Sequence, residues 1–372
     1  MLRSLVLSSL ALFTALAADH PILPIGSPAP EFTLPGIDGK THSLSEYAAS
    51  PVLAIVFTCN HCPIAQMYER RIARLAADYR QRGVAVVAIQ PNAPEATRVD
   101  ELDCSDVGDS LEEMKIRAHY KHLDYPYLYD GATQQTARAY GPQATPHVFV
   151  FDRERRLRYE GRFDNSYRME LVKSQDARDA VEALLSGREV AVPHTGVFGC
   201  STKWKEKEAG RIEALHKIES QPVTLEASSE EGLKQAHANT GERVMLLYIW
   251  SSSCSACVEE LAGIETTYRM YKLRGFDLVT VAVDPPDQRE AVLRVLKEQH
   301  VTGRNLLPDS NELSRTGSAY DPALPETVLL GPGGQLLYQH QGRLDILELR
   351  RTILANLPAE YDGFRHYWTT ER

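Results

Sequence analysis

The sequence predicts an α/β chain made of two similar units, each a central mixed sheet flanked by helices. Two Cys-x-x-Cys motifs, at 59–62 and 254–257, lie about half a chain apart. Each motif follows an apolar run typical of a buried strand, and each leads into a helical pattern that ends at Arg-Gly before a second apolar run. Because this order occurs twice, we expect strands and helices to alternate within both units.

The length and composition agree with two globular domains. The chain has 372 residues, of which 43% are hydrophobic, and this suits about two domains of ~150 residues each. The formal net charge is −9 and no basic run stands out in the sequence. Nucleic acid and anionic membrane surfaces are therefore not expected as partners.

The first residues have the features of a secretory signal peptide. Arg3 supplies a positive charge, residues 5–16 are apolar, and Ala15 and Ala17 form the small-residue pattern that precedes cleavage. The apolar run is too short to span a bilayer. We expect removal of residues 1–17, no integral membrane segment afterwards, and a periplasmic or secreted location. A buried N-terminal helix is the alternative.

The predicted elements divide the mature chain into three parts. The first domain covers residues 18–195 and the second covers residues 222–372. Between them, residues 196–221 form a linker in which an irregular stretch precedes a charged, helix-prone segment. Domain boundaries fall in such polar, irregular stretches.

A Cys-x-x-Cys motif at the start of a helix suits dithiol–disulfide exchange. The unpaired N–H groups and the positive end of the helix stabilise a thiolate, which is the nucleophile. A second cysteine one turn later resolves the mixed disulfide. We therefore expect Cys59 and Cys254 to attack, and Cys62 and Cys257 to resolve. A structural disulfide or a zinc site is the alternative, but neither motif has a second ligand pair near it in sequence.

The order strand, Cys-x-x-Cys helix, strand, helix and X-Pro before a β-run resembles the thioredoxin fold. The X-Pro pairs are Thr145-Pro146 and Leu324-Pro325. The resemblance implies that both prolines are cis and lie beside the dithiols, a role that only proline fills readily. A trans proline at the entry to an edge strand is the alternative.

Residues 26–190 resemble the redoxin branch of this fold, the alkyl-hydroperoxide-reductase-like proteins. The resemblance lies in residues 26–44, which predict a hairpin, and in the long spacing between Cys59 and Pro146. The Pro-x-x-x-Thr/Ser-x-x-Cys pattern of the peroxidases in this branch is absent, because Val52 stands seven residues before Cys59. Peroxidase activity is therefore an alternative and not the expected function.

Residues 222–357 resemble the thioredoxin-like reductases of cytochrome c maturation. The resemblance lies in Trp250, four residues before Cys254, and in the segment 324–327, Leu-Pro-Glu-Thr. That family often has a buried carboxylate near the dithiol. Tyr248 stands six residues before the first cysteine here, so this position does not supply one.

Two histidines accompany the first motif. His61 directly precedes Cys62, where the strongly oxidising periplasmic oxidase of disulfide-bond formation also carries a histidine, and a cation there stabilises a thiolate. A solvated histidine at the helix start is the alternative. His147 follows Pro146, and it faces the same cleft only if the alternation of the strand directs it there.

Cys104 and Cys200 complete an even set of six cysteines. Both lie in irregular segments rich in Asp, Gly and Ser, and an oxidising compartment favours their pairing as a structural disulfide. The alternative is that Cys200 reaches the Cys59 site as an extra resolving thiol.

These features predict an exported thiol–disulfide oxidoreductase that exchanges disulfides with protein thiols through two dithiols. A redox-partner protein is a further candidate partner. No metal or other cofactor is expected. A thiol peroxidase is one alternative function. A Cu(I)-binding protein that uses Cys59, His61 and Cys62 is another, since thiolates favour Cu(I).

Overall fold

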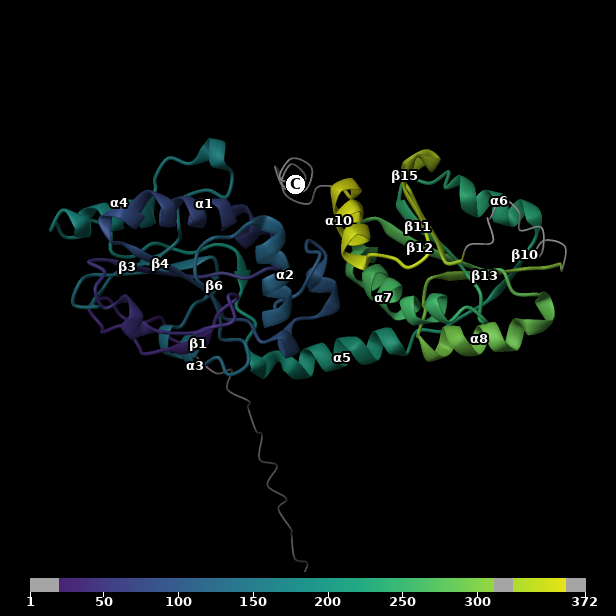
Figure 1. Ribbon diagram of the computed structural model, residues 1–372, viewed down its shortest axis with the longest axis horizontal. Helices are drawn as coiled ribbons and strands as arrows, with labels where there is room; N and C mark the ends of the chain where they lie inside the picture. The colour runs from purple at the N-terminus through teal and green to yellow at the C-terminus, as the bar shows by residue number, and fades with distance from the viewer. Residues whose placement is uncertain (1–19, 311–323, 359–372) are drawn as a thin grey trace, which may run out of the picture.

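The computed structural model describes residues 20–310 and 324–358, so the predicted signal peptide lies outside the described residues. Figure 1 shows two α/β units side by side, joined by the helix α5 (Glu208–Glu219). Each unit has its own central sheet. None of the described helices is both long and apolar enough to cross a membrane.

The first unit has a five-stranded mixed sheet. Its central strand, β3, runs parallel to β4 and antiparallel to β7. In spatial order the strands are β5 (Tyr127–Tyr129), β4 (Ala85–Gln90), β3 (Leu53–Phe57), β7 (His147–Phe151) and β8 (Leu157–Gly161).

Both faces of this sheet are covered, which explains why its strands are almost entirely apolar. On one face, Ala54 and Val56 pack against α1 (Pro63–Tyr79) and α4 (Asp176–Leu185). On the other face, the core includes α3 (Gln135–Tyr140) and the antiparallel hairpin of β1 (Thr33–Pro35) and β2 (Thr41–Ser43). The hairpin expected near residue 39 is therefore confirmed. The remaining helix of this unit is α2 (Leu111–Lys121).

The second unit has a six-stranded mixed sheet. Its helices α7 (Ser255–Tyr271), α8 (Arg289–Glu298) and α10 (Ile346–Asn356) pack on one face, and α6 (Glu230–Ala238) packs on the other. In spatial order the strands are β10 (Glu226–Ser228), β13 (Arg304–Pro308), β12 (Phe276–Ala282), β11 (Val244–Trp250), β14 (Glu326–Leu330) and β15 (Leu336–Gln341).

Equivalent positions of the two sheets are separated by a constant number of residues. Leu53 pairs with Ala85 in the first unit, and Met245 pairs with Asp277 in the second, so both partners are 192 residues further along the chain. The intervening helices, α1 and α7, are both 17 residues long. This separation allows the two dithiols to be compared position by position.

The units are docked through a polar segment of the first unit that precedes α2. The hydroxyl of Tyr271, at the end of α7, donates to the carbonyl of Ser105 at 2.7 Å. The fully buried Asp106 accepts from Arg117 of its own unit at 3.1 Å and from Arg351 of α10 at 2.7 Å. A carboxylate shared by arginines of both units fixes how they sit together.

Candidate active site

In the first unit, the second cysteine of the motif caps the helix. Cys62 is the N-cap of α1, with an extended backbone, and its Sγ accepts a hydrogen bond from the N–H of Ala65 at 3.5 Å. Pro63 occupies the first helical position, where the missing N–H costs nothing. The expectation that Cys59 lies at the helix start is therefore wrong. Cys59 lies three residues outside the helix cap.

In the second unit, the first cysteine of the motif caps the helix, as expected. Cys254 is the N-cap of α7, and its Sγ accepts from the N–H of Cys257 at 3.2 Å. The two cysteines form a disulfide. Cys254 is partly exposed, whereas Cys257 is buried.

The two motifs are thus shifted by three residues relative to their helices. Cys62 and Cys254 are 192 residues apart, the same separation that relates the sheets. By this correspondence Cys59 matches Ser251, and the helical cysteine of the second motif matches an alanine of the first. The place of a cysteine relative to the helix, and not its order in the motif, is what the two units share.

The surroundings of Cys62 stabilise its thiolate. Burial alone would raise the pKa of Cys62. Hydrogen bonds from Cys200 and Cys59, with the charge of His61 and the N–H of Ala65, lower that pKa well below its usual range. The backbone N–H of Cys200 also donates to the Sγ of Cys62, at 3.3 Å.

Cys59 has the opposite character. Its Sγ lies 3.1 Å from the hydroxyl of Thr145, and the carbonyl of Thr145 lies 3.4 Å from the Sγ of Cys62. Burial, the hydrogen bond to Cys62 and the charge of Asp109 raise the pKa of Cys59 well above its usual range. The pKa values of the two thiols are thus shifted in opposite directions.

His61 is a buried member of a hydrogen-bond network, which rules out the solvated alternative. Its Nδ1 lies 2.5 Å from Oδ2 of Asp109, and both side chains are almost fully inaccessible. Burial opposes protonation, but the Asp109 carboxylate raises the pKa of His61. The other oxygen of Asp109 accepts from the backbone N–H groups of Asn60 and His61, and Asn92 donates to Oδ2 at 2.9 Å. Asp109 therefore holds the loop between the cysteines as well as the imidazole.

No motif or spacing in the sequence singles out Asp109 or Asn92. The available signal was the polar insertion of residues 91–110, whose Asp, Asn and Ser side chains needed partners in a buried region.

His147 lies on the other face of the sheet from α1. It packs against Phe149, and its Nε2 lies 2.9 Å from Glu160, which also binds His194. Burial lowers the pKa of His147, although Glu160 opposes this shift. His147 therefore does not contact the thiols. With Glu160 it attaches the segment around His194 to β8.

Both X-Pro segments have the cis peptide bond that the resemblance implied. The peptide bonds Thr145–Pro146 and Leu324–Pro325 are both cis. Thr145 contacts both cysteines of the first motif, as described above. In the second unit, Trp250 is fully buried in the same core cluster as Cys257, and Leu324 packs against that cluster.

The predicted disulfide between Cys104 and Cys200 is wrong, because the structure forms no disulfide at either cysteine within the described residues. Cys104 is buried among residues of the second unit, and its Sγ lies 3.5 Å from the guanidinium of Arg274. Cys200 instead packs against the core around Cys62. Cys104 therefore lies where the second unit docks, and Cys200 lies beside the first dithiol.

One group of residues has the spacing of metal ligands. Cys59, His61 and Asp109 offer a sulfur, a nitrogen and an oxygen that all lie within 4.8 Å of one another. Both carboxylate oxygens of Asp109 are already hydrogen-bonded, one of them to the imidazole. Nδ1 of His61 is likewise engaged with Asp109, whereas Nε2 of His61 is buried without a hydrogen-bond partner among the described residues.

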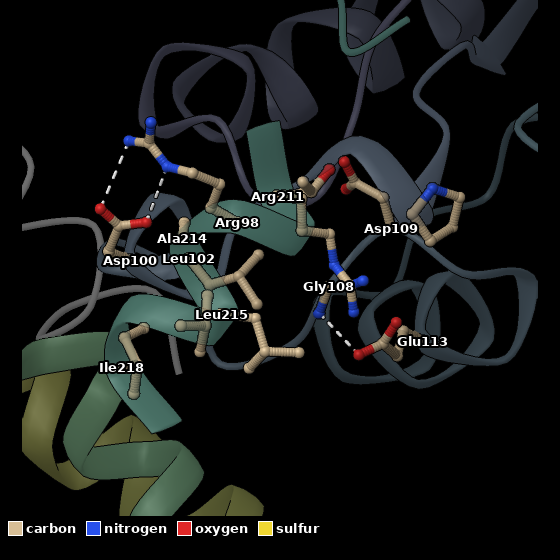
Figure 2. Close-up of a pocket in the computed structure, with 13 residues that line it drawn as sticks. Arg98, Asp100, Leu102, Gly108, Asp109, Glu113, Arg211, Ala214, Leu215 and Ile218 are labelled. Atoms are coloured by element: carbon tan, nitrogen blue, oxygen red, sulfur yellow. Dashed lines mark hydrogen bonds and ion pairs between the residues drawn. The ribbon is translucent and has the colours of Figure 1, made fainter. Parts of the chain in front are cut away.

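A cavity of about 230 Å³ lies behind Asp109, between α5 and the insertion of the first unit (Figure 2). Helix α5 contributes Ala214, Leu215 and Ile218 to its wall, and Arg211 reaches toward Gly108. No cysteine lines this cavity. The predicted linker helix is therefore packed against the first unit, close to the backbone that carries Asp109.

A mixed sheet with a cysteine-capped helix on one face and an X-cis-Pro segment at a dithiol defines a thioredoxin-like protein. Residues 25–160 match the model of the AhpC/TSA family. This part of the chain belongs to that family.

The chain is also similar to several solved structures. A hypothetical protein from Sinorhizobium meliloti is 35% identical over 50% of this chain and 97% of its own, with a TM-score of 0.44. An uncharacterized conserved protein from Geobacillus kaustophilus is 37% identical over 49% of this chain and 93% of its own, with a TM-score of 0.44. A putative thiol:disulfide interchange protein DsbE from Chlorobium tepidum is 21% identical over 44% of this chain and 97% of its own, with a TM-score of 0.33. No curated protein matches the chain.

Proposed function

We propose that the protein is an exported thiol–disulfide oxidoreductase that exchanges disulfides with protein substrates through two dithiols. One observation carries this proposal. In each unit a cysteine caps the N-terminus of a 17-residue helix, and a second cysteine of the same motif lies beside it. Helix N-termini stabilise thiolates, and the thiolate is the reactive form in disulfide exchange.

In the second unit, the exchange begins at Cys254, the partly exposed sulfur of the disulfide. A substrate thiolate attacks the Sγ of Cys254, and the sulfur of Cys257 leaves and takes up a proton. A second substrate thiolate then attacks the substrate sulfur of the mixed disulfide, and Cys254 leaves as a thiolate at the helix N-terminus. The substrate loses two electrons and the dithiol gains them. The reverse sequence reduces a substrate.

In the first unit, Cys62 is the nucleophile and Cys59 holds a proton. The lowered pKa of Cys62 and the raised pKa of Cys59 support this assignment, as does the helix cap at Cys62. The pair of His61 and Asp109 places a positive imidazole near the Cys62 thiolate.

The test is the reduction of a model protein disulfide, such as insulin, by the mature protein with dithiothreitol as the electron source. We expect the wild-type protein to accelerate the reaction and the double variant Cys62→Ser, Cys254→Ser to lose the acceleration entirely. Cys104→Ser is the matched control, since this thiol belongs to neither dithiol. Full activity of the double variant would refute the proposal.

Thiol peroxidase is a second candidate, favoured by the burial of Cys62. Cys62 is fully inaccessible, so a small hydroperoxide reaches it more readily than a protein disulfide does. Consumption of hydrogen peroxide by the wild-type protein, lost in Cys62→Ser and retained in Cys254→Ser, would establish this activity.

Export rests on the pattern of the first 17 residues. N-terminal sequencing of protein collected outside the cytosol should begin at or near Ala18. An intact Met1 would contradict export by this signal.

A further inference from the structure

A short strand after the first unit covers the first dithiol. Strand β9 (Cys200–Ser201) pairs antiparallel with β6 (Ala144–Thr145), and Cys200 lies opposite Thr145. Thr145 is the residue that contacts both cysteines of the motif. We call residues 198–203 the strap.

The strap is fastened on both sides of Cys200. The hydroxyl of Thr202 donates to the carbonyl of Pro142 at 2.7 Å, and the ammonium of Lys203 pairs with Glu101 at 2.7 Å. Gly199 has a φ of +139°, and a Cβ there would lie 2.0 Å from the carbonyl oxygen of Thr145. Only glycine allows this approach, so the local sequence is suited to a closed strap.

The strap changes which sulfur an outside molecule meets. Cys59 is 2% exposed and Cys62 is 0% exposed, whereas Cys200 is partly exposed. A protein thiol or disulfide cannot contact Cys62 while the strap is in place. It can contact Cys200, whose own N–H is 3.3 Å from the Sγ of Cys62.

We propose that Cys200 is a third exchange residue of the first unit: it forms a disulfide with Cys62, and substrate thiols attack that disulfide at Cys200. This inference rests on the proposed function, because it takes Cys62 as the nucleophile. It replaces a simple two-cysteine exchange by one in which the outermost sulfur is supplied by the strap.

The exchange balances in atoms and electrons. A substrate thiolate attacks the Sγ of Cys200, the bond between Cys62 and Cys200 breaks, and Cys62 leaves as a thiolate. A second substrate thiolate attacks the substrate sulfur of the mixed disulfide, and Cys200 leaves and takes a proton. The substrate dithiol becomes a disulfide, and its two electrons reside on Cys62 and Cys200. A substrate disulfide supplies the oxidant for the reverse sequence.

The properties of the two sulfurs suit these roles. A thiol with a low pKa leaves faster, and the helix N-terminus stabilises Cys62 as the leaving thiolate. The hydrogen bond to Cys62 and burial raise the pKa of Cys200. Attack from outside is therefore directed to Cys200, which is partly exposed, and the fully buried Cys62 departs.

Disulfide mapping tests the inference. The mature protein carrying Cys254→Ser and Cys257→Ser is combined with Cys59→Ser, oxidised with diamide, alkylated in acid and digested for mass spectrometry. We expect a peptide that joins Cys62 to Cys200. Cys200 recovered fully alkylated would overturn the inference.

A second measurement identifies the sulfur that a substrate thiol attacks. When the oxidised Cys59→Ser protein is mixed with reduced glutathione, we expect the trapped glutathione on Cys200. Trapping on Cys62 would overturn the proposed order. In the Cys254→Ser, Cys257→Ser background, Cys200→Ser should slow insulin reduction by about tenfold, and the matched control Cys104→Ser should not.

These variants separate the two proposals. Loss of exchange in Cys62→Ser together with unchanged exchange in Cys200→Ser would refute only the role of Cys200. Unchanged exchange in Cys62→Ser would refute the proposed function of the first unit itself.

Discussion

The two Cys-x-x-Cys motifs are alike in sequence and different in structure. In the second unit the first cysteine caps the helix, and in the first unit the second cysteine does so. Since Cys62 and Cys254 have the same place relative to strand and helix, they are the equivalent pair. Under the proposed function, the comparison teaches that the helix N-terminus selects the nucleophile, whichever cysteine of a motif is placed there.

The two sites also differ in access. The strap covers Cys62, whereas Cys254 is partly exposed. His61 corresponds by the separation of 192 residues to Ser253, so the buried cation of the first site has no counterpart in the second. One fold therefore presents a closed, charged dithiol and an open dithiol without that charge.

The largest expected effect concerns which cysteine attacks. A free thiol is only a few per cent thiolate at pH 7, so loss of the stabilised thiolate should slow exchange by the first unit by ~30-fold or more in Cys62→Ser. Cys59→Ser should instead leave exchange through Cys62 and Cys200 in place.

In the second unit the roles of the two cysteines of the motif should be reversed. Cys254→Ser removes the nucleophile, and Cys257→Ser traps substrate on Cys254. Mass spectrometry of trapped complexes measures both, with each unit tested while the other carries two serines. If Cys62→Ser trapped substrate on Cys59 as fast as the wild-type protein reacts, the helix cap would not select the nucleophile in the first unit.

The next effect is on the thiolate itself. Because the pKa of Cys62 is lowered, the reduced protein with Cys254→Ser and Cys257→Ser should keep a thiolate at neutral pH. Its absorbance at 240 nm should fall as the pH drops through that pKa, which lies below the usual pKa of cysteine. Cys62→Ser should abolish this transition and Cys104→Ser should preserve it. A transition only above pH 8 would show that the helix cap does not act in this way.

A smaller effect is expected on access. Gly199→Ala places a Cβ against the carbonyl of Thr145 and should displace the strap. Alkylation of Cys62 should then be faster by roughly five- to tenfold, since local opening controls the reactivity of buried groups. Gly196→Ala is the matched control, because a Cβ at that glycine meets nothing within 4 Å. Equal rates in the two variants would mean that the strap does not limit access.

The smallest effect is on the redox order of the two dithiols. Stabilising the reduced form makes a dithiol more oxidising, so Cys59–Cys62 should have the higher potential, by ~15–30 mV. His61→Ala should lower this potential, and Ser253→Ala in the second unit should leave the other potential unchanged. Potentials measured against glutathione in proteins with one intact dithiol decide this, and a lower value for Cys59–Cys62 would reverse the order.

Much of the architecture could be predicted from the sequence. Apolar runs gave the strands, and the Arg-Gly pairs at Gly83 and Gly275 mark the ends of the helical segments, where both glycines have positive φ. The start of α1 was also within reach. Pro63 prefers the first helical position, and this preference alone assigns the cap to Cys62.

The strap and the buried network were beyond sequence reasoning. Strands β6 and β9 are only two residues long, and their pairing depends on contacts formed by the folded first unit. The link between Asp109 and His61 joins residues 48 positions apart with no periodic pattern between them. Short pairings and single polar contacts carry too little local signal to be found in advance.

The place where the units meet bears on how the two dithiols can exchange electrons. Tyr271, which contacts Ser105, ends the helix that Cys254 begins. At 1.5 Å per residue these two positions are about 25 Å apart along α7. The end of α7 that contacts the first unit is thus the end remote from Cys254. The length of the helix therefore separates the second dithiol from the interface between the units. We therefore expect electron transfer between the two dithiols, where it occurs, to depend on a diffusible thiol carrier, and its rate should follow the concentration of that carrier.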